Sequence, residues 1–326
     1  MTTDRRDFIK QGLFTSAFLA SPPLARALAD QADAPLQLLA STPSLETALD
    51  AEVAKEYGKT HPPGEEPAGK LQASLGRLRE QVPQAVPLAE RMAASTKVYV
   101  LEDSRIITAA LGFESPDKQN AIMGLIVSTG AIDRILKAKN SDALADALLG
   151  HEMAHHLLEM NPKLKKEPVL QPRSRDFRDE FARMPFSLCP QETADEKELF
   201  KKNNVEYTPE NKKRYHQKLL ADKKECYVND LRADKLGFWL SHDIKAAREL
   251  YGILKSTSPL YDAFKGFDFD QQDKLIRVIG GNPNPHATFE VRVKELECTA
   301  EDMSKAERAG ERPRRTLASL TPGRNF

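Results

Sequence analysis

The sequence predicts an α+β protein that is mainly helical and has a small antiparallel or mixed sheet, and three features carry this prediction. Residues 97–103, KVYVLED, are rich in β-branched and aromatic residues, which is typical of a strand. Residues 121–130, AIMGLIVSTG, form a second strand candidate that ends at a glycine. Two long helical segments follow, at 141–160 and at about 211–241.

The chain before the first strand, residues 30–94, is expected to form a loosely built helical lead-in. It is rich in Ala and Pro and contains one helical stretch at 44–60, which ends at the Pro and Gly cluster HPPGEEPAG. A second helical stretch covers 70–81 and precedes a segment that prolines interrupt.

A group of helices is expected after the predicted strands. Residues 131–139 have a helical pattern, and Ser141 is a good N-cap for the long helix that follows. Residues 161–210 are strongly charged, with scattered prolines and no clear period, and we interpret them as a lid or insertion. More helices are expected within 243–300, and the polar, basic residues 301–326 are expected to form a flexible tail.

The first 29 residues have the features of a targeting segment. The paired arginines Arg5 and Arg6 precede Phe8 and Lys10, and a short apolar stretch follows before a small-x-small site that ends at Ala29. This pattern resembles a bacterial twin-arginine signal peptide. The resemblance implies cleavage after Ala29 and a periplasmic location for the mature chain.

Composition excludes several classes of function. Lys and Arg together number 48, as do Asp and Glu, so the formal charge is zero and nothing predicts binding to nucleic acid. No uninterrupted apolar run of 18 residues or more occurs, so no membrane-spanning helix is expected in the mature chain. At most one internal disulfide can form, and its pairing is left open among three cysteines, Cys189, Cys226 and Cys298.

The long helix at 141–160 contains the sequence HEMAHH, which predicts a metal site. His151 and His155 are four residues apart, so both imidazoles can reach one ion from the same helix face. Glu152 is placed to act as a general base on water at the ion's open position, as in zinc hydrolases that contain HExxH. His156 points away from this face and is expected at the surface or near a ligand.

An ordinary buried helix is the alternative interpretation of these histidines. They continue an apolar stripe with a spacing of four and three residues, formed by Leu144, Leu148, His151, His155 and Leu158. Burying unpaired polar groups costs several kcal/mol, however, and a metal ion satisfies them all at once. The metal is therefore the favoured interpretation.

A catalytic zinc site needs a third protein ligand, usually from another helix. The candidate segment is ECYVNDLRADKLG, residues 225–237. Together with the HExxH helix, it resembles the gluzincin metallopeptidases of the HtpX and CAAX-prenyl-protease type, in which the second helix reads ExxxD. The resemblance covers about residues 95–297 and implies a zincin-like catalytic domain at 95–300, with an edge strand beside the HExxH helix and one Zn²⁺ per chain.

The resemblance implies roles for two aspartates of this segment. Asp230 stands where the family has its glutamate ligand, and Asp234 matches the aspartate that orients a ligand histidine. Because aspartate is one methylene shorter than glutamate, Asp230 as a ligand requires the helices to lie closer together, or a bridging water. Cys226 and Glu225 remain alternative third ligands.

Two further segments match the family in their order along the chain. NAIMGLIVSTGAI resembles the family's strand segment, which implies an edge strand that pairs with an extended peptide substrate through four residues, Leu125, Ile126, Val127 and Ser128. PHATFEVR resembles the family's late His-to-Arg element, although two prolines after the histidine are missing. By resemblance, His286 would stabilise the oxyanion and Arg292 would be a structural ion-pair partner. The alternatives are a turn-capping histidine and a solvated arginine.

The leading hypothesis is an exported zinc-dependent endopeptidase that cuts extended or misfolded protein segments, with Glu152 activating a zinc-bound water. One alternative is a zinc-stabilised, chaperone-like protein without peptidase activity, which the Asp230 substitution and the missing prolines motivate. Another is an autoinhibited enzyme, in which His286 or the charged insertion occupies the open zinc position.

Overall fold

The computed structural model describes most of the chain, namely residues 44–81, 96–104, 106, 108–114, 121–160, 163–184, 186, 188, 193, 196–257 and 287–308. This part is mainly helical and contains a small mixed sheet of four strands, which confirms the predicted α+β class. The predicted signal peptide at 1–29, His286, Cys189 and residues 309–326 lie outside the described residues. The prediction of a flexible tail from residue 301 is wrong for 301–308, because these residues continue the helix Phe289–Arg308 and Met303 packs into the core.

The sheet has the strand order β1-β2-β4-β3. β1 (Thr60–His61) pairs antiparallel with β2 (Thr96–Leu101), β2 pairs parallel with β4 (Ala121–Ser128), and β4 pairs antiparallel with β3 (Thr108–Glu114). The two predicted strands are confirmed as β2 and β4. β3 was not predicted, because its sequence TAALGFE is rich in Ala and Gly, which are poor strand formers.

The prediction that Leu125, Ile126, Val127 and Ser128 form an edge strand is wrong. These residues belong to β4, whose backbone pairs with β2 on one side and with β3 on the other; Leu125, for example, lies opposite both Val98 and Ala110. All four side chains are buried, as expected for a continuous apolar run inside a sheet that is covered on both faces. Among the described strands, β3 forms the sheet edge nearest the HExxH helix.

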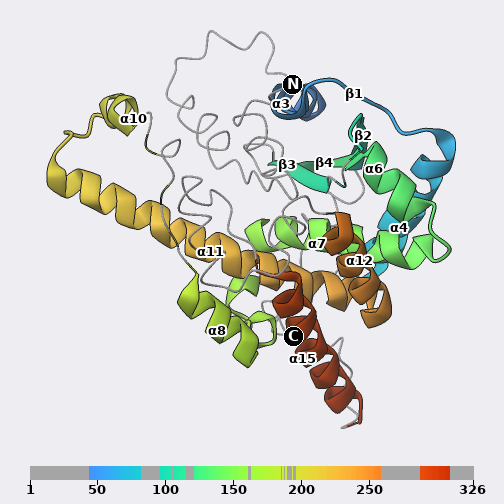
Figure 1. The fold of residues 1–326 in the computed structure, drawn as a ribbon. Coiled ribbons are helices and arrows are strands. Elements are labelled where there is room, and N and C mark those ends of the chain that lie inside the picture. The colour runs from blue at the N-terminus through green and yellow to red at the C-terminus, as the bar shows by residue number, and fades with distance from the viewer. Residues whose placement is uncertain are drawn as a thin grey trace, which may run out of the picture.

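Helices cover both faces of the sheet (Figure 1). On one face, α3 (Leu45–Tyr57) packs so closely that a Cβ on Gly124 would lie 2.6 Å from Leu49 Cδ1. On the other face, Leu125 and Val127 join a core with two helices that carry many leucines, α4 (Glu65–Gln81) and α7 (Ser141–Met160). The HExxH helix α7 therefore lies against the sheet.

α7 begins and ends where the sequence predicts, at Ser141 and Met160. The residues before it differ from the single predicted helix: a short α-turn, α6 (Thr129–Ala131), continues as a wider π-helix, η1 (Ile132–Leu136). Three more helices pack on or near α7, namely α11 (Pro209–Ser241), α12 (Ile244–Thr257) and α15 (Phe289–Arg308). No helix among the described residues is both long and apolar enough to span a membrane.

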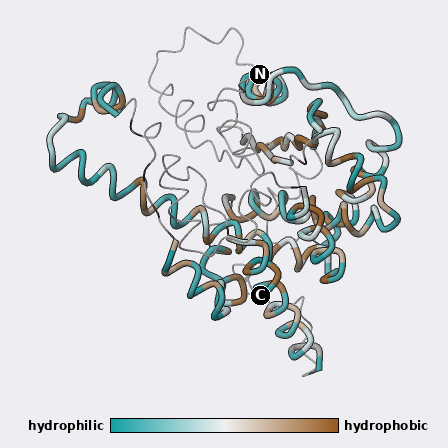
Figure 2. The backbone as a smooth tube through the Cα atoms, viewed as in Figure 1, coloured by the Kyte–Doolittle hydropathy of each residue, from teal (hydrophilic) through white to brown (hydrophobic). Residues whose placement is uncertain are grey.

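The described part of the predicted insertion includes two short 3-10 turns, η2 (Leu164–Lys166) and η3 (Pro168–Leu170), and the helices α8 (Arg175–Arg183) and α10 (Glu196–Lys202). Its first half is anchored by the buried Glu295 of α15, which accepts hydrogen bonds from Arg173 N at 2.9 Å, Ser174 N at 2.6 Å and Lys235 Nζ at 3.1 Å. The N-terminal part of α11 extends away from this core towards α10 and is mostly hydrophilic (Figures 1 and 2).

Candidate metal centre

The candidate centre lies where α7 crosses α11, and two glycines set the distance between these helices. A Cβ on Gly237 would lie 2.7 Å from His151 N and 2.8 Å from the carbonyl carbon of Gly150, so the two backbones are in direct contact here. Asp230 lies on α11 about two turns before Gly237. An aspartate on α11 can reach a metal ion bound to α7 only if the two helices lie close together, because its side chain is short. The crossing meets this condition.

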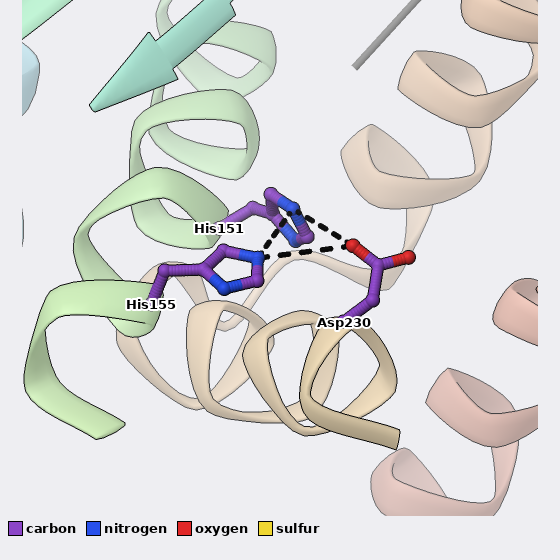
Figure 3. Close-up of side chains that lie close together, drawn as sticks. All are labelled: His151, His155 and Asp230. Atoms are coloured by element: carbon purple, nitrogen blue, oxygen red, sulfur yellow. Dashed lines mark hydrogen bonds and ion pairs between the residues drawn. The ribbon is translucent and has the colours of Figure 1, made fainter. Parts of the chain in front are cut away.

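Three side chains converge at the crossing, two from α7 and one from α11 (Figure 3). His151 Nε2 and His155 Nε2 lie 3.2 Å apart, and Asp230 Oδ1 lies 3.6 Å from the first nitrogen and 3.7 Å from the second. Asp230 is buried, and both histidines are largely so. Among the described residues, these three form a group that could hold a metal ion.

The spacing of these three atoms fits a zinc ion. Ligand atoms at about 2.1 Å from a tetrahedral ion lie roughly 3.4 Å from one another. The observed distances of 3.2, 3.6 and 3.7 Å lie close to that value. Two imidazoles and one carboxylate are also a ligand set that catalytic zinc sites use.

The charges around the crossing also favour a cation. Glu152, Asp230 and Asp234 are each 2% exposed, and the guanidinium of Arg292, 5% exposed, contacts both aspartates. The carboxylates of this buried group outnumber its guanidinium, and negative charge without a counter-charge is costly in a buried site. A divalent cation would neutralise it.

Asp234 connects His151 to α15, the last of the described helices. Its Oδ1 lies 2.7 Å from His151 Nδ1, so Asp234 contacts the ring nitrogen that does not face His155. Arg292 of α15 donates to the same carboxylate through Nε at 2.7 Å and through a terminal nitrogen at 2.6 Å, and Tyr251 of α12 also donates to it. Such a carboxylate fixes the tautomer and ring orientation of a ligand histidine.

Arg292 also reaches the candidate ligand Asp230, with a distance of 3.5 Å between its second terminal nitrogen and Asp230 Oδ2. Its guanidinium lies over the ring of Tyr251, 4.6 Å from the centroid. The structure thus places Arg292 in a buried ion pair rather than in solvent, where the alternative interpretation had it. Tyr251 has no counterpart among the residues that the sequence singled out.

Burial and neighbouring charges shift the pKa values of these groups in different directions. Burial lowers the pKa of His155 to about 3, so its imidazole is neutral, as a metal ligand must be. Burial is the largest effect on the pKa of His151 and opposes protonation, but the charge and hydrogen bond of Asp234 and the charge of Asp230 together outweigh it, so the pKa of His151 is raised. Burial alone would raise the pKa of Asp234, yet Arg292 and His151 lower it, so this carboxyl is ionised.

Glu152 follows the candidate ligand His151 on α7, and a hydrogen bond from the sheet holds its carboxylate. Its Oε1 accepts a hydrogen bond of 2.9 Å from Thr108 Oγ1, at the start of β3. Burial raises the pKa of the Glu152 carboxyl, although His151 and the Thr108 hydroxyl oppose this. A raised pKa brings a general base closer to the pH at which it can both take up and release a proton.

The other candidates for the third ligand do not join the cluster. Cys226 is exposed on α11, and Glu225 is exposed and pairs with Arg232 at 2.7 Å. His156 is buried, 7% exposed, so a surface position for it is wrong. Cys226 and Cys298 are both free thiols.

Sequence reasoning missed Thr108 and Tyr251. Both contact the site through side-chain hydroxyls from elements whose position depends on the tertiary fold, and neither lies in a motif. Comparison with known proteins gives no further guide, because no protein-family model, curated protein or solved structure matches this chain.

Proposed function

We propose that this protein is a zinc-dependent endopeptidase. The observation that carries the proposal is the tetrahedral spacing of His151 Nε2, His155 Nε2 and Asp230 Oδ1 beside a buried glutamate, Glu152. A zinc ion held by these three residues would supply a Lewis acid that lowers the pKa of a coordinated water to about 7 and polarises the substrate carbonyl.

Glu152 would move the proton in this reaction. Its carboxylate takes a proton from the attacking water, whose oxygen forms a bond to the carbonyl carbon of the peptide. The carbon–nitrogen bond then breaks, and Glu152 delivers the same proton to the leaving amine, so the carboxylate is regenerated. A glutamate serves both steps only if its pKa allows uptake and release, and the raised pKa of Glu152 supports this role.

The edge strand β3 is the element on which we expect the substrate to bind. β3 pairs with β4 along one side, and among the described strands none pairs with its other side. An extended peptide can add to such an edge through backbone hydrogen bonds, a mode that selects unfolded or flexible segments over folded ones. We therefore propose that Thr108–Glu114, and not Leu125–Ser128, pairs with the backbone of the substrate.

Two parts of the proposal rest on sequence resemblance alone. His286 would stabilise the oxyanion that forms on the substrate carbonyl. The twin-arginine pattern at 1–29 supports export to the periplasm, where unfolded or misfolded proteins would be the substrates.

The test is digestion of casein, an unfolded protein, by the purified chain and by Glu152→Gln, with the zinc content of both measured. Removing a general base lowers a rate by about 100-fold or more, and the amide should leave zinc binding intact. Glu301→Gln is the matched control, because Glu301 is exposed on α15, and it should cut at the wild-type rate.

The outcomes separate the hypotheses. Cutting by the wild type and by Glu301→Gln, but not by Glu152→Gln, with about one zinc per chain in each, supports the peptidase. Zinc in every protein without any cutting favours the chaperone-like or autoinhibited alternatives. If none of them binds zinc, the assignment of the metal centre is wrong.

A further inference from the structure

One side-chain hydrogen bond links the sheet edge to the HExxH helix. Thr108 Oγ1 donates to Glu152 Oε1 at 2.9 Å, although the two residues are 44 positions apart in the chain. Thr108 is the first residue of β3 and lies opposite Val127 of β4, so the ladder fixes its backbone. The Thr108 hydroxyl is thus held by the sheet, and its position does not depend on the helix that carries Glu152.

This bond makes the two oxygens of Glu152 unequal. Oε1 is held by Thr108, whereas Oε2 is buried and has no hydrogen-bond partner in the described part of the chain. Buried carboxylate oxygens are almost always hydrogen-bonded, because leaving one unsatisfied loses the solvation that water would give it. Glu152 follows the candidate metal ligand His151 in the chain, so an open acceptor on its carboxylate indicates an oxygen that is left for a transient partner, such as a water at the metal site.

We propose that Thr108 is a positioning residue for the general base: its hydroxyl fixes the rotation of the Glu152 carboxylate, so that Oε2 is the oxygen that takes the proton from water and returns it to the leaving amine. The inference rests on the proposed peptidase function. A glutamate has three rotatable side-chain bonds, and a base that turns freely spends much of its time in orientations from which no proton is transferred.

The position of Thr108 separates this role from substrate binding. Its side chain points towards α7, as its hydrogen bond to Glu152 requires, while the strand that it begins offers backbone groups to a substrate. Losing the hydroxyl should therefore lower kcat, because kcat depends on how the base is held, and should leave KM and zinc content unchanged.

The test compares Thr108→Val with Thr108→Ser on a fluorogenic peptide derived from casein, with kcat, KM, zinc content and Tm measured for each. Valine matches threonine in shape but lacks the donor, so kcat should fall about 10-fold or more with KM within about twofold. Serine keeps the hydroxyl, and its kcat should stay within about threefold of wild type. Thr299→Val removes a buried hydroxyl that donates to Glu295 O within α15 and not to Glu152, so it should keep the wild-type kcat.

Each outcome bears on one of the two proposals. A Thr108→Val variant with wild-type kcat, or a Thr108→Ser variant as slow as Thr108→Val, overturns the positioning role while the peptidase stands. A parallel loss of zinc or a change in KM alone also overturns it, because the threonine is then structural or binds substrate. If the wild type holds zinc and cleaves nothing, the peptidase proposal fails and the role of Thr108 fails with it.

Discussion

Single polar and charged residues hold α3 on the sheet. Asp50 of α3 accepts hydrogen bonds at 2.8 Å from Lys97 Nζ and at 2.5 Å from the Tyr99 hydroxyl, both on β2. These bonds lower the pKa of Asp50 against the smaller, opposing effect of burial. Asp50 is the carboxylate whose ionisation we expect to show most clearly in the stability of this contact.

A depressed pKa fixes the sign of the pH dependence. The folded state favours ionised Asp50, so its stabilisation is present in full above the unfolded pKa of about 3.9 and is lost as the pH falls through the lower folded value. Asp50 is half-exposed, so Asp50→Asn should lower the free energy of unfolding at pH 7 by only about 0.5–1 kcal/mol.

Urea unfolding at pH 7 and at pH 3 tests this expectation. The deficit of Asp50→Asn should be smaller at pH 3, whereas Asp133→Asn, which removes an exposed pair with Lys137 on one helix, should differ little from wild type at either pH. An equal deficit for Asp50→Asn at both pH values would show that the charge of Asp50 is not its source.

Some site residues could be predicted at this scale and others could not. His151, Glu152 and His155 lie within one helical turn, so local periodicity was enough to place them together. Asp230 and Asp234 came from a family resemblance, and the structure brings both to His151. Thr108 could not be found, because the strand that carries it has weak local preference and reaches Glu152 only through the tertiary fold.

At the scale of the elements, the crossing of α7 and α11 decides whether the site can form. Gly237 has no room for a side chain: an added Cβ would meet Gly150 and the backbone of His151 within 3 Å. Gly237→Ala must therefore push the helices apart, which should lower the free energy of unfolding by about 1–3 kcal/mol and move Asp230 away from the histidines. Zinc binding should weaken in parallel.

Gly76→Ala is the matched control for this substitution. Gly76 is exposed on α4, and nothing lies within 4 Å of the position that its Cβ would take. Alanine has the higher helix propensity, so this variant should be as stable as wild type or more stable by up to about 1 kcal/mol. Thermal unfolding and zinc titration of both variants check the prediction, and wild-type stability and affinity in Gly237→Ala would contradict it.

The sequence identified long elements better than their arrangement. α7 and α11 have strong patterns and caps, and both were predicted to within a few residues. The strand order was not, because an apolar run such as β4 fits an edge or the interior of a sheet until its neighbours are known. β3 is the neighbour that was missed, and its omission led to the wrong edge strand.

For the whole molecule, the candidate centre joins parts of the chain that are far apart. α7 provides two candidate ligands, α11 provides the third, and Arg292 of α15 pairs with both aspartates. Without a metal ion, the buried carboxylates on these helices repel one another more strongly. The stability of the folded chain should therefore depend on zinc.

Removing the metal with a chelator and adding it back tests this dependence. A ligand that binds only the folded state at 1,000 times its Kd adds about 4 kcal/mol, which should raise Tm on the order of 5–10 °C in a chain of this size. His155→Ala lacks one ligand of the cluster, so zinc should raise its Tm much less. Magnesium, which prefers octahedral oxygen ligands, should not substitute for zinc in the wild type. An equal Tm for the wild type with and without zinc would show that these buried carboxylates are balanced by other means, and the helix crossing would then be a structural polar cluster.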